Sequence, residues 1–273
     1  MNETTTAIVD ALYEHTMFGL NLLPIDKIGF FNYGYWKGGV SSIEIAQINL
    51  IETLVDFFQA KDGNILDVAC GKGASSKFLT KYFDPGHITG INISEHQLEV
   101  CKVVAPECTF KLMDATRLQF ENLSYDNILC IESALHFKTR DKFFNEAYRI
   151  LRPGGRLAMS DLLMDYEVLE RMVRTNLRGE LTKNQMMILE AHPKENYVPN
   201  LSVYRDNILK AGFRHVRVED VTEHYPKAIG EYEFKRREAE FDKRRDYNVF
   251  EGIMRGWNEP RLLFAGCLVY AIK

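Results

Sequence analysis

Several features that mark other classes of protein are missing from this sequence of 273 residues. Its five cysteines include no CxxC pair, so we expect neither a zinc site nor a redox pair, but free thiols in a reducing compartment. No apolar run is long enough to span a membrane, and the first residues, MNETTTAIVDALYEH, lack the basic stretch that begins a signal peptide. These absences predict a cytoplasmic protein.

An excess of charge of one sign is also missing. Lysine and arginine number 34 against 38 aspartates and glutamates, a formal net charge of −4. Nucleic-acid-binding domains usually carry a basic face, so we expect no nucleic-acid partner. No GxxxxGK[ST] run is present, which excludes a P-loop, and the histidines outside the motifs below show no metal-ligand spacing. We therefore expect a small-molecule substrate and no metal, while assembly into a homo-oligomer is left open.

What the sequence does have is a regular alternation that begins at Asn64. Apolar, strand-like runs cover 64–68, 87–92, 109–113, 125–133 and 156–161, and helical stretches cover 74–83, 94–105 and 140–151. Such alternation predicts βαβ units. The strand-like runs are largely apolar, as expected for parallel strands that are buried on both faces. The expected fold class is α/β, with a doubly wound, mostly parallel, Rossmann-like sheet.

Three stretches fall outside this alternation. Residues 1–60 are helical and aromatic-rich, residues 162–200 are helical and rich in methionine, and residues 224–250 are strongly charged. We expect a cofactor-binding core of 61–161 and 201–273, with 1–60 as a cap and 162–200 as a substrate lid. The charged run is interpreted as a solvated helix face, with a subunit contact or binding of an acidic substrate as the alternative.

The sharpest motif is the loop Asp67-Val68-Ala69-Cys70-Gly71-Lys72-Gly73-Ala74, which follows the first strand and opens a helix. Its two glycines let the backbone turn tightly and approach a ligand closely. The helix N-terminus favours an anionic group, either a carboxylate or a phosphate. Asp67 stands before the first glycine, where a ligand ammonium needs a carboxylate and a dinucleotide does not. Ser76 also departs from the last position of the dinucleotide pattern GxGxxG.

Together these motifs resemble the class I S-adenosylmethionine-dependent methyltransferases. ILDVACGKGASSKFL is similar to their first motif, and INIS (91–94), KLMDATRL (111–118) and LRPGGRLAMSD (151–161) are similar to later ones. The resemblance implies S-adenosylmethionine as cofactor, S-adenosylhomocysteine as product, and a seven-stranded sheet whose last strand is antiparallel. It implies that Asn92 contacts the ribose, where most members have an acid, and that Asp114 contacts the adenine amino group. The cofactor contacts expected are Tyr33, Trp36, Asp67, Ala69, Gly71, Gly73, Asn92, Ile93, Gln97, Asp114, Ala115 and Glu132.

On the acceptor side, the chain resembles natural-product and tocopherol-type methyltransferases, including the rebeccamycin sugar O-methyltransferase. NYGYW (32–36), ESALHF (132–137) and Asp161 carry this likeness. In such enzymes the aromatic N-terminal segment closes over the cofactor, and aromatic faces attract a sulfonium. The tyrosines and tryptophan of NYGYW either flank that cation or staple the cap to the core, and the two roles are compatible. Acceptor contacts are expected from Phe31, Tyr35, Met164 and Tyr197.

His136 and Asp161 are the acid–base candidates. Each lies at or just after the C-terminal end of an expected parallel strand, and open α/β sheets bind ligands at that edge. An unperturbed imidazole titrates at about pH 6.5, so a neutral His136 can take the proton of an acceptor as it is methylated. Asp161 is expected to orient the imidazole and to stabilise its cation. The alternative for His136 is a purely structural histidine.

The sequence thus predicts an enzyme of secondary metabolism that methylates a small molecule, with oxygen favoured because of the His136 and Asp161 pair. Carbon or nitrogen of an isoprenoid or indole-type metabolite is the alternative acceptor. A cyclase on the same fold would bind the cofactor without consuming it. Ser76 and Asn92 argue against a nicotinamide oxidoreductase, and the acid–base pair argues against a regulatory binding module.

Overall fold

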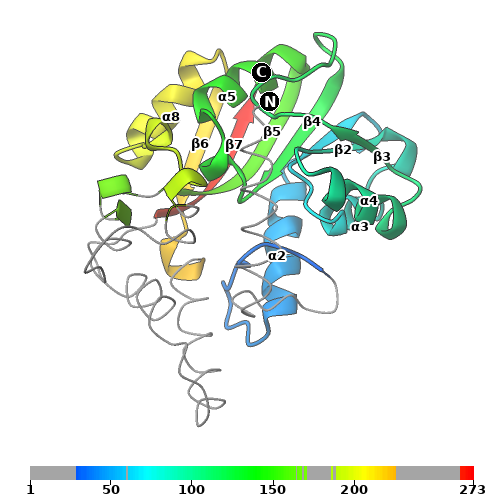
Figure 1. Ribbon diagram of the computed structural model, residues 1–273, viewed down its shortest axis with the longest axis horizontal. Helices are drawn as coiled ribbons and strands as arrows, with labels where there is room; N and C mark the ends of the chain where they lie inside the picture. The colour runs from blue at the N-terminus through cyan, green and yellow to red at the C-terminus, as the bar shows by residue number, and fades with distance from the viewer. Residues whose placement is uncertain are drawn as a thin grey trace.

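A single seven-stranded sheet organises the computed structural model, which describes residues 29–59, 61–163, 165–167, 169–170, 186, 189–225 and 265–273. The strands are β1 (Ile65–Val68), β2 (Ile88–Asn92), β3 (Thr109–Leu112), β4 (Tyr125–Ile131), β5 (Leu151–Leu163), β6 (Arg214–Asp220) and β7 (Ala265–Ile272). Their order is β3-β2-β1-β4-β5-β7-β6, and β7 pairs antiparallel with β5 and β6 while the other pairs are parallel (Figure 1). The predicted α/β, mostly parallel sheet with an antiparallel last strand is confirmed.

The described α-helices lie against this sheet, with α8 beside β6 and with α3 and α4 beside β2 and β3 (Figure 1). They are α2 (Ile43–Val55), α3 (Ala74–Leu79), α4 (Glu95–Val104), α5 (Arg140–Ile150) and α8 (Leu201–Lys210), and the 3₁₀ turns are η2 (Pro85–His87), η3 (Ala134–His136), η4 (Lys194–Asn196) and η5 (Thr222–His224). The Ser94 hydroxyl accepts from the Gln97 amide at 3.1 Å and caps α4, as its sequence position predicts.

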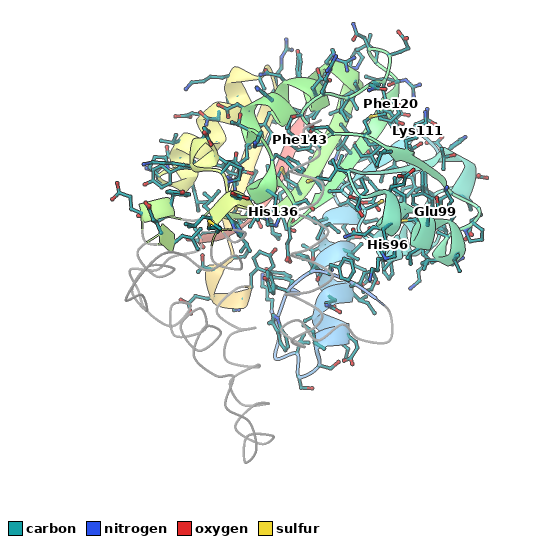
Figure 2. The ribbon with its side chains drawn as sticks, viewed as in Figure 1. His96, Glu99, Lys111, Phe120, His136 and Phe143 are labelled. Carbon is teal, nitrogen blue, oxygen red and sulfur yellow. The ribbon has the colours of Figure 1, made fainter. Side chains whose placement is uncertain are left out.

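Two separate clusters bury the two faces of the sheet. On β4, Ile128 and Cys130 pack in one cluster with Phe143 of α5 and Tyr204 of α8. Leu129, between them, belongs to the other cluster, which includes α2 and α3. Because side chains alternate along a strand and both faces are covered, β4 is apolar at successive positions. Figure 2 shows Phe143 against the sheet and His136 toward the edge from which α2 projects.

The extent of β5 differs from the prediction. A helix to residue 151 and a turn at 152–155 were expected to precede a strand beginning at 156. Instead α5 ends one residue earlier and β5 includes the whole turn. The pairing of β5 with β4 jumps from Leu151 to Arg156, so the residues between them bulge out of the ladder.

Several predictions fall on residues outside those described. They concern the cap before residue 29, most of the lid between 171 and 188, and the charged run together with the chain up to residue 264. No helix in the described part of the chain is long and apolar enough to cross a membrane.

Candidate functional site

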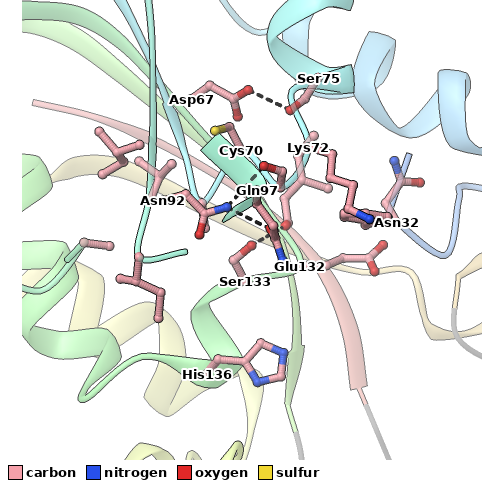
Figure 3. Close-up of a pocket in the computed structure, with 18 of the residues that line it drawn as sticks. Asn32, Asp67, Cys70, Lys72, Ser75, Asn92, Gln97, Glu132, Ser133 and His136 are labelled. Carbon is pink, nitrogen blue, oxygen red and sulfur yellow. Dashed lines mark hydrogen bonds between the residues drawn. The ribbon is translucent and has the colours of Figure 1, made fainter. Parts of the chain in front are cut away.

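A cavity of about 240 Å³ lies at the C-terminal ends of β1, β2, β3 and β4 (Figure 3). The strand order reverses between β1 and β4, and open α/β sheets bind ligands at such a point. The predicted residues that line the cavity are Phe31, Asp67, Ala69, Gly71, Asn92, Ile93, Gln97, Asp114, Ala115, Glu132 and His136. Lining residues that were not named as expected contacts include Gly29, Phe30, Asn32, Cys70, Lys72, Ser75, Met113, Ile131, Ser133, Phe137 and Lys138, of which Asn32, Cys70, Lys72, Ser75, Met113, Ser133 and Phe137 lie within the quoted motifs. The sequence therefore predicted the lining residues at the strand ends, but it did not predict most of those from residues 29–32 or those on either side of η3.

Asp67, at the end of β1, is almost fully buried and faces the start of α3. Its Oδ2 accepts hydrogen bonds from the hydroxyls of Ser75 and Ser76, both at 2.6 Å. Burial raises the pKa of Asp67 to about 6, and the two hydroxyls oppose part of that rise. The carboxylate therefore closes the loop onto the helix and also contributes negative charge to the cavity.

The two glycines of the loop serve different contacts. Gly71 has φ 55°, and a Cβ there would stand 2.8 Å from Cδ2 of Phe31 in the cap. Gly73 has φ 89°, and a Cβ there would stand 3.1 Å from Cα of Cys101 in α4. Glycine is favoured at both positions because the backbone is left-handed and because a side chain would collide with a close neighbour. Gly71 lines the cavity, whereas Gly73 lets the loop pack against α4.

Asn92 and Asp114 lie at the ends of the neighbouring strands. The amide nitrogen of Asn92 donates to the carbonyl of Gly71 at 3.2 Å and to Oε1 of Gln97 at 2.9 Å, which ties β2 to the loop. Oδ1 of Asp114 accepts from the backbone and the hydroxyl of Thr116, both at 2.8 Å. These bonds fix the direction of both side chains at the cavity before any ligand binds.

Glu132 follows β4 in a strained, left-handed conformation with φ 49°. Its amide donates to the carbonyl of Ser160 at 3.0 Å, and its Oε1 accepts from the backbone of Tyr33 at 2.8 Å. Burial raises the pKa of Glu132 to about 8. The carboxyl is therefore protonated at neutral pH in the unliganded protein, and it joins the cap to the edge of the sheet.

His136 lines the cavity from η3, and its Nδ1 lies 2.7 Å from the carbonyl oxygen of Ala191. A carbonyl can only accept, so Nδ1 carries the hydrogen and the lone pair of the neutral ring is on Nε2. Burial, together with the charge of Arg140, lowers the pKa of His136 to about 4. The ring is therefore neutral at physiological pH, as a general base has to be.

The environment of Asp161 corrects one prediction. Its carboxylate is fully buried and binds Arg140, whose Nε donates to Oδ2 at 2.6 Å and whose Nη2 donates to Oδ1 at 3.2 Å. The hydroxyl of Tyr204 donates to the same Oδ2 at 2.6 Å. Asp161 was expected to orient His136, but the carbonyl of Ala191 makes that contact. The difference arises because an arginine on α5 lies close enough to neutralise the buried acid.

The aromatic segment 33–36 contacts the turn η5. The Trp36 backbone donates to the carbonyl of His224 at 2.7 Å, and its indole donates to the carbonyl of Tyr33 at 2.9 Å. The ring of Tyr35 contacts that of His224 edge-on, with centroids 6.3 Å apart. The three aromatic residues expected to flank the sulfonium, Tyr33, Tyr35 and Trp36, are not among the residues that line the described cavity. Phe31, expected on the acceptor side, is.

Of the other expected acceptor contacts, Tyr197 is not at this cavity. Tyr197 is 48% exposed and is not among the lining residues, and Met164 is outside the described part of the chain. Asn196, the residue before Tyr197, is buried and binds the turn that carries His136. No pattern in the sequence pointed to Asn196, because its partners lie far away along the chain.

Comparison with known proteins agrees with this geometry. A family model described as a methyltransferase domain matches residues 66–159. Methyltransferase GfsG of Streptomyces halstedii is 30% identical over 201 residues, which are 70% of this chain and 68% of that protein. The chain belongs to the class I S-adenosylmethionine-dependent methyltransferases.

Two further similar proteins match the chain to different extents. Erythromycin 3''-O-methyltransferase of Saccharopolyspora erythraea is 30% identical over 201 residues, and the match covers 70% of this chain but only 64% of that protein. The cyclopropane synthase MmaA2 from Mycobacterium tuberculosis has a TM-score of 0.70 at 20% identity, over 98% of this chain and 97% of that one. The second likeness shows that the fold is shared.

The residues at the cavity fit S-adenosylmethionine, the cofactor of the family. The molecule has an amino-acid end with an ammonium and a carboxylate, and a nucleoside end with ribose hydroxyls and an adenine. Asp67 supplies a carboxylate, the loop opens the N-terminus of α3, and Asn92 and Asp114 supply polar atoms on adjacent strand ends. A side chain at Gly71 would narrow the space between loop and cap.

Proposed function

We propose that this protein methylates an oxygen atom of a small, natural-product-like acceptor, with S-adenosylmethionine as methyl donor and His136 as general base. The observation that carries the proposal is that one cavity is lined both by the glycine loop of the cofactor motif and by His136. Relatives such as the erythromycin 3''-O-methyltransferase favour oxygen over carbon or nitrogen as the acceptor atom.

In this proposal the strand ends hold the cofactor. Asp67 binds the ammonium, the loop amides from Gly71 onward bind the carboxylate, Asn92 binds the ribose, and Asp114 binds the adenine. When bound, the cofactor supplies an electrophilic methyl group on a positively charged sulfur. Most of the rate acceleration then comes from holding the acceptor in line with that methyl group.

The same proposal divides the chain into units with separate tasks. The units are a core of 61–161 and 201–273, a cap of 1–60 and a lid of 162–200. In support, Phe31 of the cap lines the cavity and Ala191 of the lid binds His136. Cap and lid would enclose the acceptor beside the core.

His136 does the proton chemistry through Nε2. Because its pKa is lowered to about 4, the ring stays neutral and able to accept a proton down to about pH 5. An acceptor hydroxyl becomes strongly acidic only as its oxygen bonds to the methyl carbon, so a weak base in the right place is sufficient. The imidazolium forms as the positive charge of the cofactor is lost, so the buried cavity does not have to hold both cations.

The decisive experiment incubates the full chain with isotopically labelled S-adenosylmethionine and a panel of hydroxylated macrolides, glycosides and phenols. Mass spectrometry follows S-adenosylhomocysteine and locates the label. Label on an acceptor oxygen supports the proposal. Label on carbon or nitrogen supports the alternative acceptor class, and a changed acceptor without S-adenosylhomocysteine indicates a cyclase.

The role of His136 is tested by His136→Ala. We expect kcat to fall about 100-fold or more, within the range of general base catalysis, with the affinity for S-adenosylhomocysteine unchanged. His192→Ala is the matched control, because that ring lies 4.8 Å from the His136 ring between centroids and is not among the residues lining the described cavity. Full kcat in His136→Ala would remove His136 from the mechanism.

A further inference from the structure

The turn that carries His136 is held by a stretch of the lid. Ala191 and Asn196 both belong to the described residues 189–200, more than fifty residues further along the chain. The Ala191 carbonyl accepts the hydrogen bond from Nδ1 of His136 at 2.7 Å. This one contact decides which imidazole nitrogen keeps its lone pair. The lid therefore sets the chemical state of the proposed base.

Asn196 fastens this stretch to the turn with its side chain. Its amide nitrogen donates to the carbonyl of Ala134 at 2.7 Å and to that of Leu135 at 3.1 Å, the two residues before His136 in η3. Its Oδ1 accepts from the backbone nitrogen of Arg140 at 2.7 Å. Both N–H groups and the oxygen of the amide are thus engaged, and the residue is only 5% exposed.

The buried ion pair below the turn supports Asn196 in its place. Arg140 donates from Nη1 to the backbone carbonyl of Asn196 at 2.6 Å and from Nε to Asp161 at 2.6 Å. Tyr204 of α8 binds the same carboxylate at 2.6 Å. Asp161 is therefore connected to His136 through Arg140 and Asn196, which explains how an acid at this strand end can matter to the base without orienting it directly.

We propose that Asn196 is a positioning residue, which seats the stretch 189–200 on the η3 turn so that the Ala191 carbonyl holds His136 in the Nδ1–H tautomer. The inference rests on the proposed role of His136 and deepens it by assigning the orienting function to the lid. It follows that the tautomer of the proposed base depends on the position of residues 189–200.

Loss of the Asn196 side chain has a specific consequence. Asn196→Ala removes both donors from the carbonyls of Ala134 and Leu135 and the acceptor for the Arg140 amide, so only the bond from Arg140 Nη1 to the backbone carbonyl at 196 still holds the stretch here. Ala191 is then no longer fixed opposite Nδ1. The neutral imidazole can exchange between its two tautomers, and the Nδ1–H form loses its preference.

Nitrogen NMR of the imidazole rings reads this tautomer directly. The full chain is labelled with ¹⁵N and studied with and without S-adenosylhomocysteine, and the His136 signals are identified by their loss in His136→Gln. We expect the Nδ1–H form in the wild type and a mixture in Asn196→Ala. An Nε2–H ring in the wild type overturns the proposal, even if Asn196→Ala fails to fold. This readout needs no methyl transfer, so its failure is distinguishable from failure of the proposed function.

Asn200→Ala is the matched control, four residues away. Asn200 caps α8 by accepting from the Val203 amide at 2.9 Å, so its loss weakens the fold without touching the η3 turn. We expect turnover of an acceptor found in the panel to fall about 100-fold in Asn196→Ala, as small displacements of a base do, and to stay at the wild-type level in Asn200→Ala. An unchanged tautomer in Asn196→Ala, or equal turnover in the two variants, would make Asn196 merely structural.

Discussion

The two sides of the cavity are built in different ways. On the cofactor side, the contacts are local, as where Asp67 accepts from Ser75 eight residues further on. On the acceptor side, His136 depends on Ala191 across 55 residues, and Asn196 reaches back 62 residues to Ala134. The centre of the first side is therefore a strand, a loop and a helix in immediate succession, with Asn92 and Asp114 added from the next strand ends, and a buried network of distant segments forms the second.

This contrast indicates how each side responds to damage. The loop after β1 keeps its shape through its own glycines and serines, so it should retain nucleoside affinity when the acceptor side is disturbed. The acceptor side depends on the ion pair of Arg140 and Asp161, whose side chains are 5% and 0% exposed. Its catalytic geometry should therefore be lost before cofactor binding is.

The largest effect is expected from Arg140→Met. The variant leaves the Asp161 carboxylate buried without its cation, and breaking a buried pair in this way costs about 3–5 kcal/mol. Urea denaturation of the variant and the wild type measures the loss. In the folded variant at low temperature, calorimetry should still find S-adenosylhomocysteine binding at close to wild-type affinity.

The control for this prediction is an arginine of an exposed pair. Arg217 binds Glu219 at 2.9 Å with side chains 62% and 39% exposed, so Arg217→Met should cost less than about 1 kcal/mol. Replacing both buried partners, in Arg140→Met with Asp161→Leu, should recover part of the stability because no charge is left unpaired. Equal losses in the two arginine variants would show that the buried network does not hold the acceptor side.

The next effect in size belongs to the cofactor side. Gly71→Ala forces a side chain into a left-handed backbone and puts its Cβ 2.8 Å from the ring of Phe31. We expect the Kd for S-adenosylhomocysteine to rise about 30-fold, roughly 2 kcal/mol. Gly154→Ala is the matched control, with φ 79° and no atom within 4 Å of the new Cβ. It should share the backbone cost and leave the Kd unchanged, and an equal rise in both variants would contradict a role for the loop in binding.

The cofactor side could be predicted from sequence because its signals are local. The loop after an apolar strand predicted Asp67 and Gly71 at the ligand site, the next strand ends predicted Asn92 and Asp114, and the structure places all four around one cavity. The extent of β5 was less predictable. The residues at 152–155 look like an ordinary helix stop, but Leu151 before them and Arg156 after them both pair with β4, so the turn belongs to β5.

The acceptor side was only half predictable. Asp161 was found at the right strand end, but its partner was not, since Arg140 opens an amphipathic helix and looks like an ordinary exposed residue there. Asn196 and Ala191 carry no motif at all. Their roles follow from contacts across more than fifty residues, which no local pattern encodes.

The smallest effect expected is a pH dependence of cofactor binding that comes from Asp67 on the cofactor side. Burial raises the pKa of Asp67 from 3.8 to about 6, so its carboxylate is ionised above that pH and protonated below it. An ammonium prefers the ionised form, so affinity for S-adenosylhomocysteine should fall about tenfold from pH 7 to pH 5 as the carboxylate takes up its proton. The stability of the unliganded protein should change in the opposite direction, since protonation of Asp67 favours the folded state and this contribution is lost as pH rises through about 6.

Calorimetry at pH 5, 6 and 7 measures how the affinity for S-adenosylhomocysteine changes with pH, and Asp67→Asn should make that affinity nearly independent of pH. Two other titrating groups at the cavity add little in the same window, because the pKa of His136 is lowered to about 4 and that of Glu132 is raised to about 8. A slope that persists unchanged in Asp67→Asn would mean that the ammonium is held elsewhere. Cofactor binding would then depend on residues outside the loop that follows β1.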